Sequence, residues 1–321
     1  MSESLFDQVR GRCAQVAERS RFVRIQHERI ADYAGSLLDE TPAPAELDPA
    51  HHYVGHGPDT GAFILTLDAV NFGSGYFPHL KKRPGMSGYF TVASSLNEYF
   101  VEHGPLSPEQ LAELSADDCC EVFGQNRENE TAFGLMGLFA SALNDLGRLV
   151  AERFEARFLR LVEEAEESAE KLVRILSEMP FYRDVQRYGD LDIPFYKRAQ
   201  LTAADLALAF DGNGPGRFRD LDQLTIFADN LVPHVLRMDG ILDYDPDLLA
   251  RIDRAELIEA GSAEEIEIRA CAVAAVERIR EEAVLDGADV TSMNLDYRLW
   301  NRGQGSSYKA RPRHRCRCVF Y

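Results

Sequence analysis

The stretch GSAEEIEIRACAVAAVERIREEAV, residues 261–284, indicates the class of fold. Ser262 and Glu265 have the spacing of a capping box, in which an N-cap hydroxyl and a glutamate three residues later satisfy free N–H groups at the start of a helix. Apolar residues then recur at positions 266, 273, 276 and 279, which is a helical spacing. Because similar spacing recurs along the chain, the sequence predicts a mostly α globular protein with minor β content.

Most other segments also carry apolar residues three and four positions apart. Helices are expected over residues 4–16, 21–38, 88–102, 107–116, 131–150, 151–178 and 289–300. A further helix is expected over LTAADLALAF, residues 201–210, with Thr202 as its N-cap, and two more are expected to flank Pro233. AFILTLDAVNF, residues 62–72, is the one segment with a possible strand pattern.

The chain is expected to form one functional unit over residues 1–321, with no internal repeat. Pro180, Gly189 and Pro194 interrupt the helical pattern, so residues 180–196 are the expected place for a change of subdomain.

Charge limits the kinds of partner. The 321 residues have a formal net charge of -18, which disfavours a protein that grips a polyanion through many phosphates. From Arg302 to the end there are six basic residues and no acidic one, so the preceding residues hold 29 basic against 53 acidic side chains, a net charge of -24. This basic tail could bind one phosphate group, or it could pair with the acidic body.

Other classes of site and location are disfavoured by missing patterns. The six cysteines have neither zinc spacing nor the arrangement of a disulfide framework, and the eight histidines do not share one helical face. There is no signal-like N-terminus, no apolar run of membrane-spanning length and no nucleotide-binding glycine motif. A cytoplasmic protein without metal, cofactor or membrane partner is expected, and its oligomeric state is left open.

One carboxylate stands out within an apolar stretch. LTIFADNLVPHVL, residues 224–236, places Asp229 among side chains typical of a protein interior. An ionised aspartate loses several kcal/mol on leaving water without partners, so such a residue needs a use. It could be an N-cap for the segment leading to Pro233, or a functional anion. Lys197, just ahead of an expected helix, also has two interpretations: a surface lysine or a residue of the site.

Aromatic residues gather near amides and carboxylates at two places. Phe72, Tyr76 and Phe77 follow Asn71 in one loop, and Trp300, the single tryptophan, follows NLDYRL. Flat rings with polar groups at their edges can hold a heteroaromatic ligand. Core filling is the alternative interpretation of the same rings.

Several motifs in consistent order carry a resemblance to a known family. They are LDAVNFGSGYF (67–77), GYFTVASSLNEYF (88–100), DLDIPFYKRAQLTAADL (190–206), GRFRDLDQLTIFADNLVPHVLRMDGILDYDPDL (216–248), GSAEEIEIRACAVAAVE (261–277), LDYRLWNRGQ (295–304) and PRHRCRCVFY (312–321). Over roughly residues 20–321 the chain resembles the queuosine salvage protein family.

The resemblance implies an N-glycosidase that splits queuosine 5'-monophosphate into queuine and ribose 5-phosphate. It also implies a mostly helical fold similar to the helix-hairpin-helix DNA glycosylases. The aspartate of the FAD motif, Asp229, would be catalytic, with Lys197 in the same site. The expected substrate-binding residues are Asn71, Phe72, Tyr76, Phe227, Asn230, Asp296, Trp300, His314 and Arg315. Eukaryotic relatives carry a more aromatic run after NF than the Gly73-Ser74-Gly75 of this chain, so stacking is expected to fall to Tyr76 or Phe77.

A mechanism follows from the chemistry of the glycosidic bond. Its cleavage develops positive charge on the ribose, which Asp229 could stabilise as an anion, attack as a nucleophile, or use indirectly by activating water. Because a 7-deazaguanine has no N7 to protonate, charge on the leaving base must be taken up at its pyrimidine edge, with Asn71, Asn230 or a tyrosine as candidate donors. Arg313, Arg315 or His314 could hold the 5'-phosphate.

Two other classes of function compete with this one. A non-catalytic protein that captures queuine or a nucleotide would bind the base without releasing ribose. A DNA glycosylase would need a positively charged grip on the duplex, which a body of this charge lacks.

Overall fold

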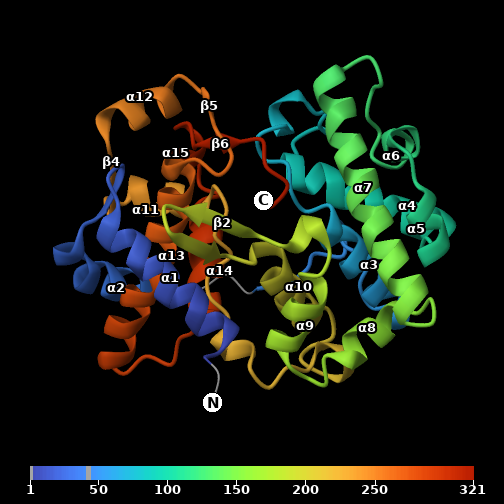
Figure 1. The fold of residues 1–321 in the computed structure, drawn as a ribbon, viewed down its shortest axis with the longest axis horizontal. Helices are drawn as coiled ribbons and strands as arrows, with labels where there is room; N and C mark the ends of the chain where they lie inside the picture. Colours follow the sequence, from blue (N-terminus) through green and yellow to red (C-terminus); the bar gives the residue numbers. More distant parts are fainter. Residues whose placement is uncertain (1–2, 41–44) are drawn as a thin grey trace. The chain divides into compact units, whose positions relative to one another are not determined.

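The computed structural model describes residues 3–40 and 45–321, and this part of the chain is mostly helical with three small two-stranded sheets (Figure 1). The mostly α class predicted from the sequence is therefore confirmed. All six cysteines lie in the described part as buried free thiols. No helix of the described ranges is both long enough and apolar enough to cross a membrane.

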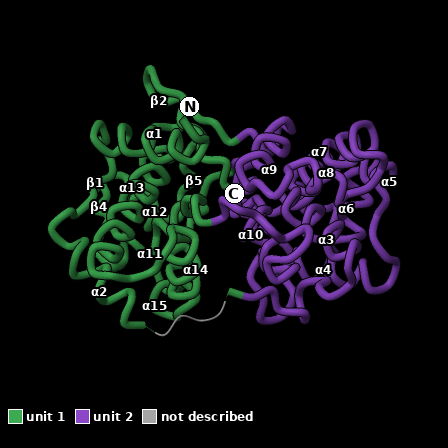
Figure 2. The backbone as a smooth tube through the Cα atoms, turned by 90° about the horizontal axis from the view of Figure 1, so that it is seen from below, with its two compact units in different colours: residues 1–45, 184–197, 222–317 green, residues 46–183, 198–221, 318–321 purple. Residues whose placement is uncertain are grey.

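The chain divides into two compact units, each built from segments that are distant in sequence (Figure 2). Unit 1 contains the described residues of 1–45 together with 184–197 and 222–317. Unit 2 contains residues 46–183, 198–221 and 318–321. The helix α10 (Lys197–Ala209) begins with the last residue of a unit 1 segment and continues into unit 2.

Unit 1 is built around α13 (Ala263–Leu285), which contacts α1, α2, α11 and α14. Every residue from Glu265 to Glu277 on this helix is buried, so it is covered on all sides rather than on one face. The other helices of the unit are α1 (Leu5–Arg19), α2 (Ile30–Asp39), α11 (Val232–Met238), α12 (Pro246–Asp253), α14 (Ser292–Arg302) and α15 (Ser306–Lys309).

The three sheets all belong to unit 1. β1 (Val23–Ile25) pairs antiparallel with β4 (Leu242–Tyr244), and β2 (Val185–Tyr188) pairs antiparallel with β3 (Leu191–Pro194). β5 (Leu257–Ile258) pairs in parallel with β6 (Arg315–Cys316).

Unit 2 is helical throughout its described regular elements, and α7 is its longest helix (Figure 1). α7 contacts α3, α5 and α6, while α3 also contacts α4 and α8. The helices of the unit are α3 (Pro58–Ala69), α4 (Gly88–His103), α5 (Pro108–Glu113), α6 (Ala116–Val122), α7 (Glu130–Arg153), α8 (Phe158–Glu164) and α9 (Ala169–Leu176), followed by the rest of α10.

Two predicted elements have the wrong type. The possible strand over residues 62–72 is the helix α3, whose residues 60–69 are all buried. A helix covered on all sides has no polar face, so its apolar run cannot be distinguished from a buried strand by periodicity. The helix expected over 21–38 begins only at Ile30, because Val23–Ile25 pair with β4.

Three predicted boundaries are also wrong. The helix expected over residues 151–178 is interrupted by left-handed residues at 155–156 and at 166–167, which no continuous helix can contain. Thr202 is not an N-cap, because α10 starts at Lys197 and the Thr202 hydroxyl donates to the Arg198 carbonyl one turn earlier. Of the two helices expected around Pro233 only α11 forms, with the proline in its first turn.

The start of α13 confirms half of the predicted capping box. The Ser262 hydroxyl accepts a hydrogen bond from the Glu265 N–H at 3.3 Å, as an N-cap should. The Glu265 carboxylate accepts from the Gly261 N–H at 3.3 Å, one residue before the position that the capping box requires.

Candidate active site

Residues 224–231 lead into α11 without forming a helix or strand, and buried polar partners hold their backbone. Asp296 of α14 accepts a hydrogen bond from the Phe227 N–H at 2.8 Å. Nε of Arg269, on α13, donates to the Ala228 carbonyl at 2.9 Å. The backbone on the N-terminal side of Asp229 is thus fixed by two of the principal helices of unit 1.

Asp229 is partly exposed and uses one carboxylate oxygen to start α11. Its Oδ1 accepts from the Leu231 N–H at 2.7 Å and from the Val232 N–H at 3.1 Å. Its Oδ2 accepts no hydrogen bond from residues 3–40 or 45–321. Asp229 is therefore not the N-cap considered from the sequence, because that position is Leu231, but its Oδ1 holds the backbone that leads into α11 and leaves the second oxygen for another partner.

Asp296 is a second carboxylate in the same electrostatic environment, with a side chain that is 4% exposed. Burial raises its pKa well above the ordinary value, and the negative charge of Asp229 raises it further. The Phe227 N–H and the charge of Lys197 act in the opposite direction but do not cancel these effects. Asp296 therefore holds its proton more tightly than an ordinary aspartate does.

Two cations complete this group, which we call the Asp229 cluster: Asp229, Asp296, Lys197 and Arg313. Lys197 is 6% exposed and begins α10. Arg313 is exposed, yet its surroundings desolvate the guanidinium and lower its pKa, while the charge of Asp229 partly restores it. The cluster combines one capped carboxylate, one carboxyl group of raised pKa and two basic groups.

A buried ion pair lies behind the cluster, and sequence reasoning did not identify it. Arg269 binds Asp184 through two contacts, Nη1 to Oδ1 at 3.0 Å and Nη2 to Oδ2 at 2.5 Å. The exposed fractions of these side chains are 0% and 2%. The only signal in the sequence is a charged residue inside an apolar part of the longest helix of unit 1, at IRACAVAAV (268–276).

The predicted phosphate contacts lie among the last residues of unit 1. The amide Nδ2 of Asn230 donates to the His314 carbonyl at 3.3 Å, and the Arg315 guanidinium donates to the Ala255 carbonyl. Burial and the charges of Arg269 and Arg313 lower the pKa of His314 to about 3. His314 is therefore uncharged near neutral pH, and of the three candidates only Arg313 and Arg315 bring positive charge.

Phe227 and Trp300 differ in how they lie in unit 1. Phe227 is buried and makes an edge contact with Tyr297, their ring centroids lying 6.2 Å apart. Trp300 is half-buried and lies one helical turn after Asp296 on α14, so both project from the same side of that helix.

Asp239 and Glu40 bind Arg302, so for this residue of the basic tail pairing with the acidic body is observed.

Asn71, Phe72 and Tyr76 belong to unit 2. Phe72 is 1% exposed and packs against Phe139 and Phe181, with ring centroids 5.2 and 5.7 Å apart, as a core ring would. Asn71 and Tyr76 are half-buried, as is Phe77. The loop is held by its backbone, because the N–H groups of Gly73 and Ser74 donate to the Tyr321 carbonyl.

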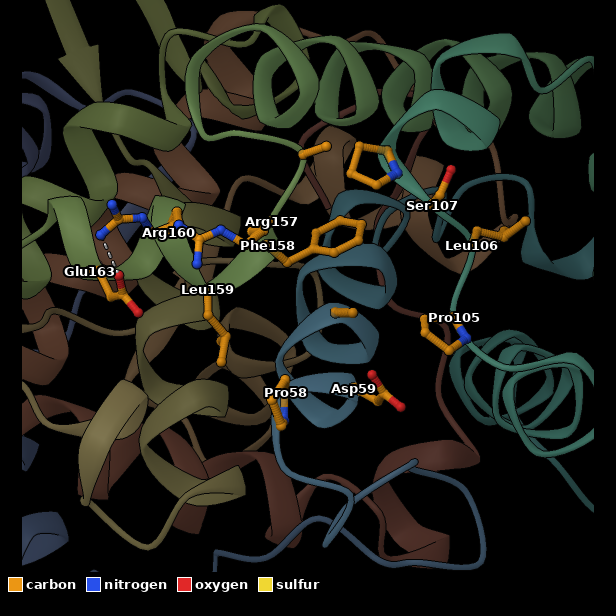
Figure 3. Close-up of a pocket in the computed structure, with 13 residues that line it drawn as sticks. Pro58, Asp59, Pro105, Leu106, Ser107, Arg157, Phe158, Leu159, Arg160 and Glu163 are labelled. Carbon is orange, nitrogen blue, oxygen red and sulfur yellow. Dashed lines mark hydrogen bonds and ion pairs between the residues drawn. The ribbon is translucent and has the colours of Figure 1, made fainter.

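Unit 2 also contains a cavity that none of the predicted site residues lines (Figure 3). Its volume is about 470 Å³, and Figure 3 shows Phe158, Leu159 and several prolines around it, with Arg160 bound to Glu163 at one side.

Within residues 3–40 and 45–321, no group of three or more His, Cys, Asp or Glu side chains is placed to hold a metal ion.

Comparison with known proteins assigns the chain to a family. The model of the queuosine salvage protein family matches residues 51–321. A protein of Sphaerobacter thermophilus named queuosine 5'-phosphate N-glycosylase/hydrolase is 36% identical, covering 96% of this chain and 95% of its own. Proteins with the same name from Mus musculus and Bos taurus are 31% and 30% identical, each covering 95% of this chain and 96% of their own. The chain belongs to the queuosine salvage protein family.

Proposed function

We propose that this protein is an N-glycosidase that hydrolyses queuosine 5'-monophosphate to queuine and ribose 5-phosphate. Full-length similarity to relatives named for this activity supports the reaction and its substrate. The observation that carries the proposal within this chain is the Asp229 carboxylate, capped at one oxygen and open at the other, beside the raised-pKa carboxyl group of Asp296.

In the proposed mechanism Asp229 stabilises the ribose as the bond to the base lengthens. A fixed negative charge near the anomeric carbon favours the oxocarbenium-like transition state over the neutral ground state. The two N–H groups that bind Oδ1 orient the carboxylate before substrate arrives. Oδ2 then faces the sugar as anion or nucleophile, or holds the attacking water.

The departing base needs a proton or a hydrogen-bond donor, and Asp296 is the strongest candidate in unit 1. A carboxyl group whose pKa is raised can act as an acid beside a second carboxyl group that acts as the anion. The raised pKa of Asp296 supports the acid role. Asn230 is less suited than the sequence suggested, because one of its two amide N–H groups already donates to the His314 carbonyl.

The 5'-phosphate is assigned to the basic end of unit 1, with Arg313 as its first contact. Arg313 is exposed and lies within the electrostatic influence of Asp229, as a group binding the same nucleotide should. The roles of Asn71, Tyr76 and Trp300 as contacts of the base stay predictions from the sequence, and the proposed substrate is a free nucleotide rather than a polynucleotide. The similarity to helix-hairpin-helix DNA glycosylases and the cytoplasmic location remain predictions.

The test is release of queuine and ribose 5-phosphate from queuosine 5'-monophosphate, measured by mass spectrometry. Asp229→Asn keeps an oxygen that can accept from the Leu231 and Val232 N–H groups but removes the negative charge, so a loss of rate of about a hundredfold or more is expected with little loss of stability. Asp243→Asn, at an exposed position of β4, is the matched control.

Two results would contradict the proposal. Tight binding of the nucleotide by the unmodified protein without any ribose 5-phosphate would indicate a binding protein instead of an enzyme. Near-normal hydrolysis by a folded Asp229→Asn variant would exclude the proposed role of this carboxylate.

A further inference from the structure

The ion pair between Arg269 and Asp184 contacts the backbone beside both predicted catalytic residues. On one side, Nε of Arg269 donates to the carbonyl of Ala228, the residue before Asp229. On the other side, Oδ2 of Asp184 accepts from the backbone N–H of Lys197 at 3.3 Å. The pair joins three stretches that are far apart in the sequence: residues 184–197, residues 228–229 and Arg269. Its two side chains therefore fix the relative positions of two parts of the site.

We infer that Arg269 and Asp184 are positioning residues, which set where Asp229 and Lys197 lie without touching the substrate. This inference rests on the proposed function, because that function gives Asp229 its role and the family motifs place Lys197 in the same site. Neither side chain of the pair is accessible, with exposed fractions of 0% and 2%, so neither reaches a ligand at the surface of the site.

The geometry of the guanidinium suits this task. Its terminal nitrogens bind the two oxygens of Asp184, and its third nitrogen binds the Ala228 carbonyl, so its plane is fixed at three points. The Phe195 ring covers the guanidinium, whose central carbon lies 3.9 Å from the ring centroid. Lysine has the same charge but cannot reproduce these contacts from one planar group.

A strained residue next to Lys197 gives independent support. Tyr196 has a φ of 48°, in the left-handed region that residues other than glycine rarely adopt. Its N–H, and that of Phe195, donate to the Asp184 carbonyl at 3.3 and 2.8 Å. Such strain persists where surrounding contacts impose it, and it clusters at functional sites. Asp184 thus holds the turn into Lys197 through its backbone as well as its side chain.

Stability alone is a weak reason to bury this pair. Taking two charges out of water costs free energy that their attraction repays only in part, and apolar replacements of similar volume often give equal or greater stability. The pair instead fixes the orientation of two backbone groups. Apolar side chains would fill the space but could not hold the Ala228 carbonyl or the Lys197 N–H.

The test separates positioning from folding by measuring kcat, KM and Tm for four variants. Arg269→Lys and Asp184→Asn are expected to lower kcat about a hundredfold while KM changes less than about threefold, because small displacements of a reacting group have effects of this size. Because Arg269 also lies 3.6 Å from the buried Glu265 carboxylate, the apolar replacement must neutralise that group as well. The triple variant Arg269→Met, Asp184→Leu and Glu265→Gln is expected to recover Tm relative to the single variants but not kcat.

Glu267→Gln is the matched control. Glu267 is a buried carboxylate on the same helix, two residues from Arg269, and it accepts hydrogen bonds from the backbone of residues 21–23 and from Tyr188. Its removal should lower Tm while kcat stays within about twofold, measured well below the transition.

The outcomes distinguish the inference from the proposed function on which it rests. If Asp229→Asn is inactive but Arg269→Lys and Asp184→Asn keep kcat within about twofold, the positioning role is wrong and the proposed function stands. Recovery of kcat together with Tm in the triple variant would also overturn it. If Asp229→Asn itself stays active, the proposed function fails, whatever the pair does.

Discussion

Acidification should destabilise unit 1 through two buried histidines, His234 and His314, both 2% exposed. The Arg237 guanidinium lies 3.0 Å from Nδ1 of His234, and the Tyr308 carbonyl lies 2.9 Å from Nε2. Because arginine only donates and a carbonyl only accepts, this pair of contacts requires the neutral ring with its proton on Nε2. A second proton would break the contact with Arg237.

The size of the effect follows from the pKa values. Burial lowers the pKa of His234 to about 4 and that of His314 to about 3, against 6.5 in the unfolded chain. Below pH 6.5 the unfolded state therefore binds more protons than the folded state, and stability falls as the pH falls. Linkage gives about 2 kcal/mol for each histidine between pH 7.5 and pH 5, or about 4 kcal/mol together.

The assay is urea unfolding followed by circular dichroism from pH 7.5 to pH 5, for the unmodified protein and for a variant with both histidines replaced by glutamine. Asp296 contributes equally to the pH dependence of both proteins, with a sign opposite to that of the histidines. The difference between the two proteins in the slope of unfolding free energy against pH therefore isolates the histidines. Parallel curves for the two proteins would refute the assignment of buried neutral rings.

Two further predictions concern the Asp229 cluster. Asp296→Asn should lower kcat about a hundredfold if Asp296 supplies a proton. Because the folded pKa of Asp296 is raised, its contribution to stability is fully present below the unfolded pKa of about 3.9 and is lost as the pH rises through the folded pKa. The variant should lack this loss above about pH 4, and an unchanged pH dependence of unfolding would show that Asp296 ionises normally. Arg313→Gln should raise KM for the 5'-monophosphate about tenfold, because a hydrogen bond to a charged group contributes about 1.5–3 kcal/mol. The same variant should leave KM for the nucleoside unchanged; exposed Arg311→Gln is its control, and equal effects on both substrates would exclude a phosphate contact.

The helical class could be predicted because amphipathic helices and their caps are local signals. α1, α4 and α14 have buried positions that repeat with helical spacing, and the structure confirms them. α3 has no such contrast, since residues 60–69 are all buried, and its apolar run was therefore ambiguous. The breaks after α7 and α8 use non-glycine residues in the left-handed conformation, for which the sequence carries no glycine signal.

Candidate site residues could be named from the sequence only where their chemistry contrasted with the surrounding residues or a family motif supplied them. Asp229 was recognisable as a lone carboxylate in an apolar stretch, and the family motifs supplied Lys197. Asp184 and Arg269 were not recognisable, because their 85-residue separation hides the pairing and a helix buried on all sides gives no face on which a charge looks misplaced. Partners that meet only in the folded state leave no periodicity to detect.

A net charge of -18 raises the question of how the proposed site attracts a nucleotide that is itself a dianion. At physiological ionic strength charges more than about 8 Å apart are largely screened, so the groups next to the ligand decide the potential that it meets. In the Asp229 cluster burial and the charge of Asp229 raise the pKa of Asp296 and so disfavour its negative charge, while Lys197 and Arg313 are the basic groups. Whenever Asp296 is protonated, the two basic groups outnumber the one remaining anion, Asp229, which is left for the ribose. Ionising Asp296 would remove this excess, so the same raised pKa serves both substrate binding and departure of the base.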